Sequence, residues 1–185
     1  MEGRERLALH SCCAPCSSYV LEFLSRNFDV TVFFYNPNIH PHQEYLHRLS
    51  EQKRLCAALG VPLVECEYDD DKYFEYVKGL ESEPEGGARC ERCFEMRLRN
   101  TARLAALSGF KLLTATLTVS PHKNAGLINS IGEAAADGQG LSWLPCDFKK
   151  RGGYQRSIEL SRQYQLYRQN YCGCIFSKRE GGTDE

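Results

Sequence analysis

The chain has 185 residues, with 23 lysines and arginines against 24 aspartates and glutamates, and therefore a formal net charge of −1. A hydrophobic fraction of 42% with 25% charged residues is typical of a globular protein and excludes a disordered or fibrous chain. No stretch approaches the roughly 20 apolar residues that span a bilayer, and the first residues lack the apolar segment of a secretory signal. We therefore expect a cytoplasmic protein with no membrane partner.

Strands and helices are predicted to alternate along the chain. Apolar and β-branched runs predict five strands, at Arg6–His10, Asp29–Tyr35, Pro62–Tyr68, Lys111–Ser120 and Leu141–Cys146. Apolar residues at helical spacing predict six helices. The first four lie at Ser17–Asn27 with Ser17 or Ser18 as the N-cap, Pro41–Leu59, Asp69–Leu80 and Cys90–Gly109. The fifth runs from about Lys123 to Ala136, preceded by Ser120 as an N-cap and Pro121, and the last has Leu160, Tyr164 and Tyr167 on one face.

This alternation predicts an α/β fold with a parallel sheet of about five strands and right-handed crossovers. We expect a single domain over residues 1–178 and a disordered tail over residues 179–185. In such sheets a ligand binds beyond the carboxyl ends of the strands. The site is therefore expected among the loops that follow His10, Tyr35, Thr118 and Cys146.

Ten cysteines stand out in a chain of this length. Structural disulfides are rare in a reducing cytosol, where clustered cysteines are typical of metal ligands or redox thiols. Seven of the ten form three groups, Cys12, Cys13 and Cys16, then Cys90 and Cys93, then Cys172 and Cys174. Of the rest, Cys56 and Cys66 are predicted to be core residues, and Cys146 is left open.

The first two cysteine groups stand where a loop enters a predicted helix. A helix N-terminus favours thiolate charge and lowers the pKa of a thiol there. Iron–sulfur clusters are commonly held by four thiolates, so the two junctions could jointly close one cluster. A thioredoxin-like redox motif is the rival interpretation for Cys13 and Cys16.

The third group, Cys172–Gly173–Cys174, is too closely spaced to chelate one zinc ion comfortably. A disulfide at this spacing is strained and easily cycled, so we interpret the group as a redox pair, with ligation of a further metal as the rival. Asp147 either ligates a metal or caps its loop. His10 is interpreted as a hydrogen-bonded histidine at a strand end.

Charge is distributed unevenly. Residues 65–85 carry nine acidic against two basic side chains, whereas residues 148–179 carry eight basic against one acidic, a local balance of +7. Lysine and arginine contacts to phosphate supply most nonspecific affinity for nucleic acid. We therefore predict that Lys149, Lys150 and Arg151 bind RNA, with a solvated surface as the alternative.

Six motifs in this order, HSCCAPCSS, FYNPNIHPHQEYLHR, EGGARCERCFEMRL, LTVSPHKN, CDFKKRGGY and QNYCGCIFS, resemble the epoxyqueuosine reductase QueH family over about Leu7 to Ser177. The resemblance implies a Rossmann-like, HUP-type fold and an iron–sulfur enzyme. It also implies the last step of queuosine synthesis, the two-electron deoxygenation of epoxyqueuosine to queuosine in tRNA. The family's 4Fe–4S ligands correspond to Cys12, Cys13, Cys90 and Cys93.

The same resemblance assigns the family's close-spaced pair to Cys172 and Cys174, for which we predict a catalytic role as a redox-active disulfide. Removal of an epoxide oxygen as water requires two electrons and two protons. A single cluster passes one electron at a time, so a neighbouring dithiol or an additional mononuclear iron must complete the reaction. The expected partners are tRNA that carries epoxyqueuosine and an electron donor such as a ferredoxin or flavodoxin.

Two other functions are considered. An ATP-dependent tRNA sulfur-insertion enzyme is disfavoured because no SGGxDS-like pyrophosphate loop is present. A noncatalytic tRNA-binding module stabilised by zinc is disfavoured because the thiols exceed the needs of one tetrahedral site.

Overall fold

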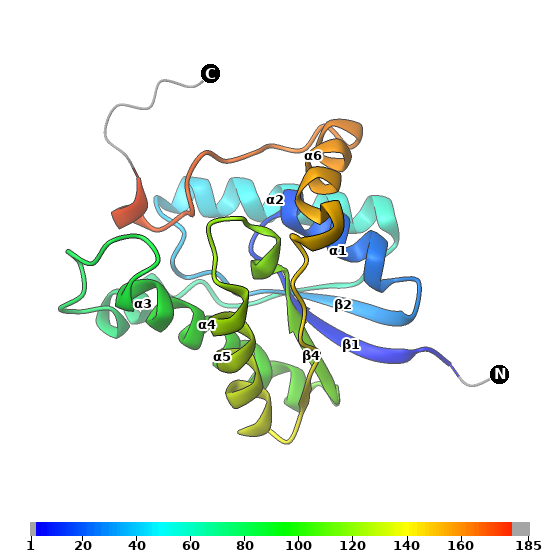
Figure 1. The fold of residues 1–185 in the computed structure, drawn as a ribbon, viewed down its shortest axis with the longest axis horizontal. Helices are drawn as coiled ribbons and strands as arrows, with labels where there is room; N and C mark the ends of the chain where they lie inside the picture. The colour runs from blue at the N-terminus through cyan, green and yellow to red at the C-terminus, as the bar shows by residue number, and fades with distance from the viewer. Residues whose placement is uncertain (1–2, 179–185) are drawn as a thin grey trace.

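The computed structural model describes residues 3–178 and arranges their strands in one all-parallel sheet with the order β3-β2-β1-β4-β5 (Figure 1). The strands are β1 (Glu5–His10), β2 (Phe28–Phe34), β3 (Leu63–Glu65), β4 (Leu112–Ala115) and β5 (Ser142–Trp143). Leu7 of the central strand β1 is paired with Val30 on one side and Leu112 on the other. The predicted α/β fold with a five-stranded parallel sheet is confirmed.

Helices cover both faces of this sheet (Figure 1). Within residues 3–178 they are α1 (Ala14–Leu24), α2 (His42–Leu59), α3 (Asp70–Tyr76), α4 (Ala88–Leu107), α5 (Ala125–Asp137) and α6 (Gly153–Gln163), with short 3-10 helices η1 (Thr116–Val119), η2 (Lys150–Gly152) and η3 (Ile175–Ser177). None of these helices combines the length and the apolar character needed to cross a membrane. The tail predicted for residues 179–185 lies outside the described residues.

The core is divided by the alternation of side chains along the central strand. Leu7 and Leu9 of β1 point to one face, where Leu21 of α1 and Leu55 of α2 pack. Ala8 points to the other face and packs in the cluster that contains Leu98 of α4. Because successive side chains of a strand point to opposite faces, a single apolar strand serves both layers.

Two predicted N-caps are wrong, and both have a local cause. Helix α1 begins at Ala14, with Pro15 in its first turn, and the Ser17 and Ser18 hydroxyls donate backward to the carbonyls of Cys13 and Pro15 at 2.9 and 2.8 Å instead of capping the helix. The helix expected from about Lys123 begins at Ala125, and its N-cap is Asn124 instead of Ser120, because the Asn124 side chain accepts a 3.1 Å hydrogen bond from the Leu127 amide.

Several predicted elements are longer than the observed ones. The strand expected to reach Ser120 ends at Ala115 and continues as η1. The last helix ends at Gln163, so Tyr164 and Tyr167 are not on its face. Instead, the Tyr167 amide donates to the Glu51 carboxylate of α2 at 2.8 Å. Contacts with α2 therefore replace the helical path that periodicity predicts.

Candidate metal and redox site

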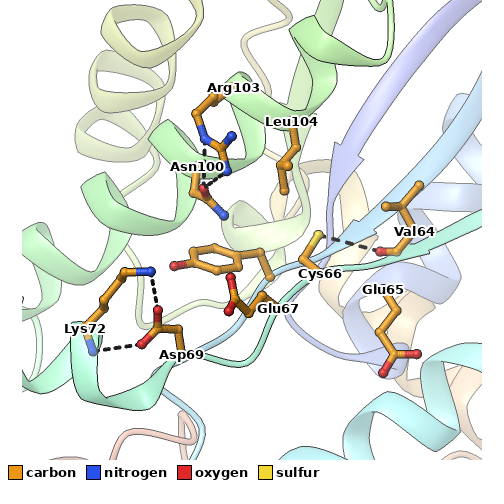
Figure 2. A pocket seen from close by; sticks show the side chains of 10 residues that line it. Val64, Glu65, Cys66, Glu67, Asp69, Lys72, Asn100, Arg103 and Leu104 are labelled. Carbon is orange, nitrogen blue, oxygen red and sulfur yellow. Dashed lines mark hydrogen bonds and ion pairs between the residues drawn. The ribbon is translucent and has the colours of Figure 1, made fainter.

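A cavity of about 420 Å³ lies beside the edge strand β3 and is lined by Tyr35, Cys66 and residues of α4 (Figure 2). Two of its cations have partners within the lining. Arg103 donates to Asn100 Oδ1 at 3.0 Å, and Lys72 forms an ion pair with Asp69. None of the seven clustered cysteines lines this cavity, so it is not the candidate site.

The candidate site is the cysteine loop, which comprises residues 11–16 between β1 and α1. The sulfur atoms of Cys12, Cys13 and Cys16 all lie within 4.8 Å of one another, and Cys12 Sγ is 3.7 Å from Cys13 Sγ. Such a triad can bind a metal ion. The loop stands at the carboxyl end of β1, beside β4, where the order of the parallel strands reverses and α/β proteins bind ligands.

Three other elements fix the position of the cysteine loop. Thr116 Oγ1, at the start of η1, accepts a 3.2 Å hydrogen bond from the Cys12 amide and lies 3.3 Å from Cys12 Sγ. Ser11 Oγ donates to Gln52 Oε1 of α2 at 2.7 Å. Asn36, in the loop after β2, donates to the Ser11 carbonyl at 2.8 Å. The thiols are therefore held by a preformed backbone.

The three thiols of the loop differ in their protonation. Hydrogen bonds from Cys13 and Cys16 hold the pKa of Cys12 well below the ordinary cysteine value. The same hydrogen bond to Cys12 raises the pKa of Cys13 to about 11, and the pKa of Cys16 is raised as well. Cys12 is thus the thiolate of the triad, and the other two thiols share their protons with it.

Two cations lie beside these thiols. Burial works against the Lys123 ammonium, but its interactions with Cys172, Cys12 and Cys16 outweigh burial and raise the pKa of Lys123. The buried Arg97 of α4 donates from Nη2 to Asn36 Oδ1 at 2.7 Å, and its Nη1 lies 3.9 Å from Cys93 Sγ. Sequence reasoning missed both cations, which neutralise thiolate charge. A largely buried thiol triad with adjacent cations suits an anionic metal–thiolate group.

Cys90 and Cys93 lie in the first two turns of α4, as the loop-to-helix prediction requires. They lie outside the triad, so the structure separates the four predicted ligands into two pairs. Cys16, which is not among those four, lies with Cys12 and Cys13. Cys90 packs against the core cluster that contains Cys12 and Cys13.

The predicted lowering of the thiol pKa at this helix start is wrong. Burial raises the pKa of Cys90 and raises that of Cys93 to about 12. Desolvation of the thiolate therefore exceeds the effect of the helix dipole at these positions.

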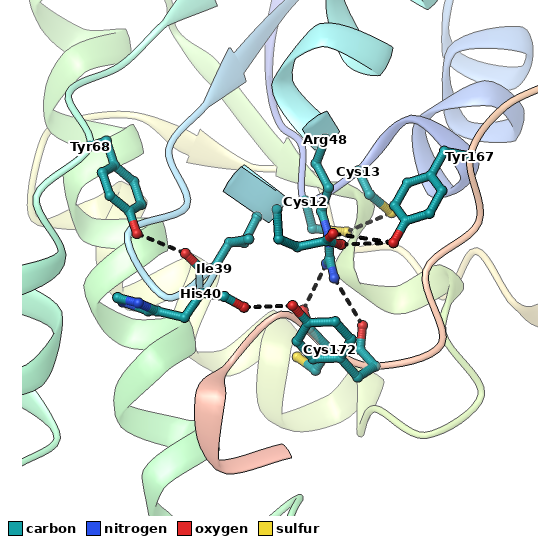
Figure 3. A network of polar contacts seen from close by, with 10 residues as sticks. Cys12, Cys13, Ile39, His40, Arg48, Tyr68, Tyr167 and Cys172 are labelled. Carbon is teal, nitrogen blue, oxygen red and sulfur yellow. Dashed lines mark hydrogen bonds and ion pairs between the residues drawn. The ribbon is translucent and has the colours of Figure 1, made fainter. Parts of the chain in front are cut away.

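Cys172 and Cys174 belong to the C-terminal segment, residues 164–178, which follows α6 (Figure 3). All ten cysteines lie in the described residues and are free. The buried Cys174 Sγ is 3.0 Å from the Tyr73 hydroxyl of α3 and packs in one cluster with Cys93. Cys172 is half-buried, and its interactions contribute to the raised pKa values of Arg97 and Lys123. The two cysteines of the pair thus have different surroundings.

The remaining polar candidates have structural partners. His10 Nε2 donates to the Tyr35 carbonyl at 3.1 Å, and burial and Arg97 lower the pKa of His10 to about 3, so the ring is neutral. Asp147 forms ion pairs with Lys149 at 3.1 Å and with Lys150 at 3.5 Å. Asp147 therefore closes its own loop, in agreement with the capping alternative.

The predicted nucleic-acid residues Lys149, Lys150 and Arg151 lie in or next to η2, after the carboxyl end of β5. Lys149 Nζ donates to the Lys123 carbonyl at 3.2 Å, which connects this basic loop to the cation beside the thiols. The side chain of Lys150 is 75% exposed, and that of Arg151 is also exposed. Two of the three cations are therefore available to an anionic partner.

The chain is similar to known proteins over most of its length. The family described as "Epoxyqueuosine reductase QueH" matches residues 7–180. The epoxyqueuosine reductase QueH of Staphylococcus epidermidis is 44% identical and covers 98% of this chain and 79% of its own length. The protein of the same name from Streptococcus pyogenes is 42% identical, and the match covers 98% of this chain and 73% of that protein. For the one from Thermotoga maritima the identity is 36%, and the match covers 93% of this chain and 90% of that protein.

A similar fold occurs in the U34-tRNA thiolase NcsA from Methanococcus maripaludis, solved with its [4Fe-4S] cluster. The TM-score is 0.61 at 12% sequence identity, and the match covers 96% of this chain and 63% of the thiolase chain. At this identity the similarity concerns the fold.

Proposed function

The chain belongs to the epoxyqueuosine reductase QueH family and is an oxidoreductase, and we propose that it reduces epoxyqueuosine to queuosine in tRNA by means of a metal group at the cysteine loop and the thiols of Cys172 and Cys174. The observation that carries the proposal is the triad of the buried Cys12 and Cys13 and the partly buried Cys16 at the strand switch point. Family membership favours this function over sulfur insertion and over a zinc-stabilised binding module.

The metal group that we assign to the loop is a 4Fe–4S cluster. Cys12 and Cys13 would hold it with Cys90 and Cys93, and Cys16 is a further candidate ligand. When bound, such a cluster supplies electrons one at a time. Arg97 and Lys123 stabilise the negative charge of the ligating thiolates, and the packing of Phe94 and Leu98 around Cys12 and Cys13 keeps water from them.

The second group is the dithiol. In the proposed step the sulfur atoms of Cys172 and Cys174 form a disulfide bond, both carbon–oxygen bonds of the epoxide break, and an alkene forms. The epoxide oxygen leaves as water with the two thiol hydrogens. Two electrons from a ferredoxin or flavodoxin, with two protons from water, then restore the dithiol.

An additional mononuclear iron is the alternative to this dithiol step. Cys172, Cys174, Cys16 and Asp147 are its candidate ligands. The ion pairs of Asp147 with Lys149 and Lys150 argue against Asp147, and the hydroxyl contact of Cys174 with Tyr73 favours a thiol that exchanges a proton.

The proposed tRNA surface is the basic loop of Lys149, Lys150 and Arg151. Its carbonyl and amide contacts with Thr118 and Lys123 keep it beside the thiols, and two of its cations are exposed. Replacement of all three by glutamine should reduce the slope of log K against log salt by about 1 for each lost phosphate contact. An unchanged slope would assign this surface to solvent. Free thiols in this number suit a cytoplasmic location, which we also propose.

The function is tested on protein purified without oxygen. We expect iron with acid-labile sulfide, turnover of tRNA that carries epoxyqueuosine, and a C174S variant that keeps its iron but loses turnover. Normal turnover in C174S would remove the redox role, and partial loss of iron would favour a second metal. Zinc without sulfide in the unmodified protein would overturn the cluster assignment.

A further inference from the structure

The C-terminal segment contains no regular structure between the end of α6 and η3, yet it carries Cys172 and Cys174. Helix α2 supplies much of what holds it. Two arginines of this helix, Arg48 and Arg54, each donate two hydrogen bonds to carbonyls of the segment. Arg48 binds the part of the segment that carries the thiols, and Arg54 binds the part that directly follows α6.

Arg48 holds the part that carries the thiols (Figure 3). Its Nη1 donates to the Cys172 carbonyl at 3.1 Å and its Nη2 to the Tyr171 carbonyl at 3.2 Å. Its Nε donates to Glu44 Oε1 at 2.6 Å. The Arg48 side chain is only 2% exposed. A planar guanidinium that binds two consecutive carbonyls fixes the orientation of the peptide between them.

The surrounding contacts leave this turn little freedom. The Tyr171 hydroxyl donates to the His40 carbonyl at 2.5 Å, and the His40 amide donates to the Gly173 carbonyl at 2.8 Å. Gly173 has φ +108°, and a Cβ there would lie 3.0 Å from both Arg48 Nη1 and Ile39 Cγ1. The absence of a side chain at Gly173 is thus what lets the turn approach Arg48.

Arg54 makes the same kind of contact away from the thiols. It donates to the carbonyls of Tyr164 and Gln165, both at 2.9 Å, and pairs with Glu51 at 2.8 Å. Its side chain is 49% exposed, and the two residues it binds lie eight and seven positions before Cys172. Arg54 therefore anchors the same segment and provides a matched control.

We propose that Arg48 is a positioning residue for the reductase reaction, which holds the Cys172–Gly173–Cys174 turn in the orientation that brings the dithiol to the substrate. The inference deepens the proposed function and rests on the redox role of the pair. A dithiol transfers electrons to an epoxide only when its sulfur meets the reacting carbon, and a displacement of about 1 Å can lower the rate about a hundredfold. Lysine at this position keeps the charge but cannot bind two carbonyls and Glu44 with one planar group.

The test compares R48K with R54K in the full chain, purified without oxygen with its metal. We expect R48K to lower kcat by about tenfold to a hundredfold while KM stays within about twofold, because bound substrate meets a misplaced dithiol. The iron content should not change. R54K should keep kcat within about twofold. In reduced, metal-free protein, R48K should also change the ratio of Cys172 to Cys174 alkylation by iodoacetamide, and R54K should not.

Equal kcat and an equal alkylation ratio in R48K and R54K would overturn the inference. Normal turnover in both C172S and C174S would instead overturn the redox role itself, so the two failures are distinguishable. If R48K does not fold, E44Q takes its place, since it keeps both carbonyl contacts of Arg48 but removes the charge that orients the guanidinium. A fall in kcat in E44Q that is smaller than the tenfold to hundredfold fall expected for R48K supports the inference. An unchanged kcat together with an unchanged alkylation ratio contradicts it.

Discussion

The cysteine loop and the C-terminal turn that carries Cys172 and Cys174 are held in place by different means. The cysteine loop continues a strand in the middle of the sheet, where Leu9 is paired with both Val32 and Thr114, and it enters α1 directly. The turn of Tyr171–Cys174 is held by side chains from other elements, chiefly Arg48 and Tyr73. The cysteine loop thus has regular backbone structure on both sides in addition to its side-chain contacts, whereas the turn depends chiefly on contacts from distant residues. Loss of one side-chain contact should therefore disturb the turn more than the cysteine loop.

The largest expected effect is on metal retention at the cysteine loop. C13S removes a buried sulfur from the triad, so we expect loss of most bound iron and of turnover, with the sheet still folded. C56S is the matched control, because Cys56 is also buried but receives only a hydrogen bond from Gln52 at 3.3 Å. Iron and sulfide analysis with circular dichroism measures both. Full iron content in C13S would remove Cys13 from the ligand set.

The next effect tests whether the cysteine loop depends on the core. Leu98 is fully buried in the cluster that also contains Cys12 and Cys13, so L98A should reduce the free energy of unfolding by about 2–5 kcal/mol. L107A, on the same helix at 75% exposure, should change it by less than about 0.5 kcal/mol. Denaturant unfolding is the measurement. Equal values for the two variants would show that α4 does not support the loop.

A smaller effect is expected where η1 meets the loop. T116V replaces the hydroxyl that accepts the Cys12 amide hydrogen with a methyl group of similar size. A buried amide left without an acceptor costs about 1–3 kcal/mol, so unfolding should occur at lower denaturant concentration. Faster loss of iron to a chelator should accompany this change. Retention of both properties would mean that Thr116 only fills space.

The contact of Tyr73 with Cys174 should affect the stability of the turn and not that of the whole protein. Y73F removes the hydroxyl 3.0 Å from Cys174 Sγ, which we expect to cost about 0.5–1.5 kcal/mol. Because the turn lies outside the sheet, the loss should appear as faster amide exchange in residues 164–178 and an altered rate of Cys174 alkylation. A fall in global stability with no local change would contradict the comparison of the two regions.

The smallest effect concerns the ion pair between α1 and α6. Hydrogen bonds from Arg156 lower the pKa of Glu22, and the pair has a 2.7 Å contact on a partly exposed surface. Its stabilisation is present above the unfolded carboxyl pKa and is lost as pH falls through the lowered folded value. E22Q should therefore be less stable by about 0.2–1 kcal/mol at neutral pH and equal to the unmodified protein in acid. A stability difference that grows toward acid would reverse this assignment.

The sheet and the place of the cysteine loop could be predicted because their signals are local. The apolar run that predicts a strand at Arg6–His10 lies within the observed Glu5–His10, and the parallel order brings the next loop to the expected edge. The start of α4 was expected close to Cys90 and is at Ala88. Periodicity and chain order contain this information without any knowledge of distant partners.

The rest depends on partners that are distant in the sequence. Arg48 and Cys172 are 124 positions apart, and nothing near Arg48 distinguishes it from the solvated arginines of an amphipathic helix. Tyr167 has helical spacing from Leu160 and Tyr164, but contacts with Glu44 and Glu51 hold it in a nonhelical segment. Burial, which reversed the predicted direction of the Cys90 and Cys93 pKa values, is likewise a property of the folded chain.

Arg48 recognises main-chain oxygen atoms and not the side chains of the residues that it holds. These two hydrogen bonds therefore do not depend on which side chains stand at positions 171 and 172, since every residue type has the same main-chain carbonyl. Replacing the Cys172 thiol with a hydroxyl leaves both hydrogen bonds available. The side chain at Cys172, for which we propose a redox role, can thus be exchanged while both contacts from Arg48 remain, which makes the turn a suitable position at which to install a selenol or a spectroscopic label.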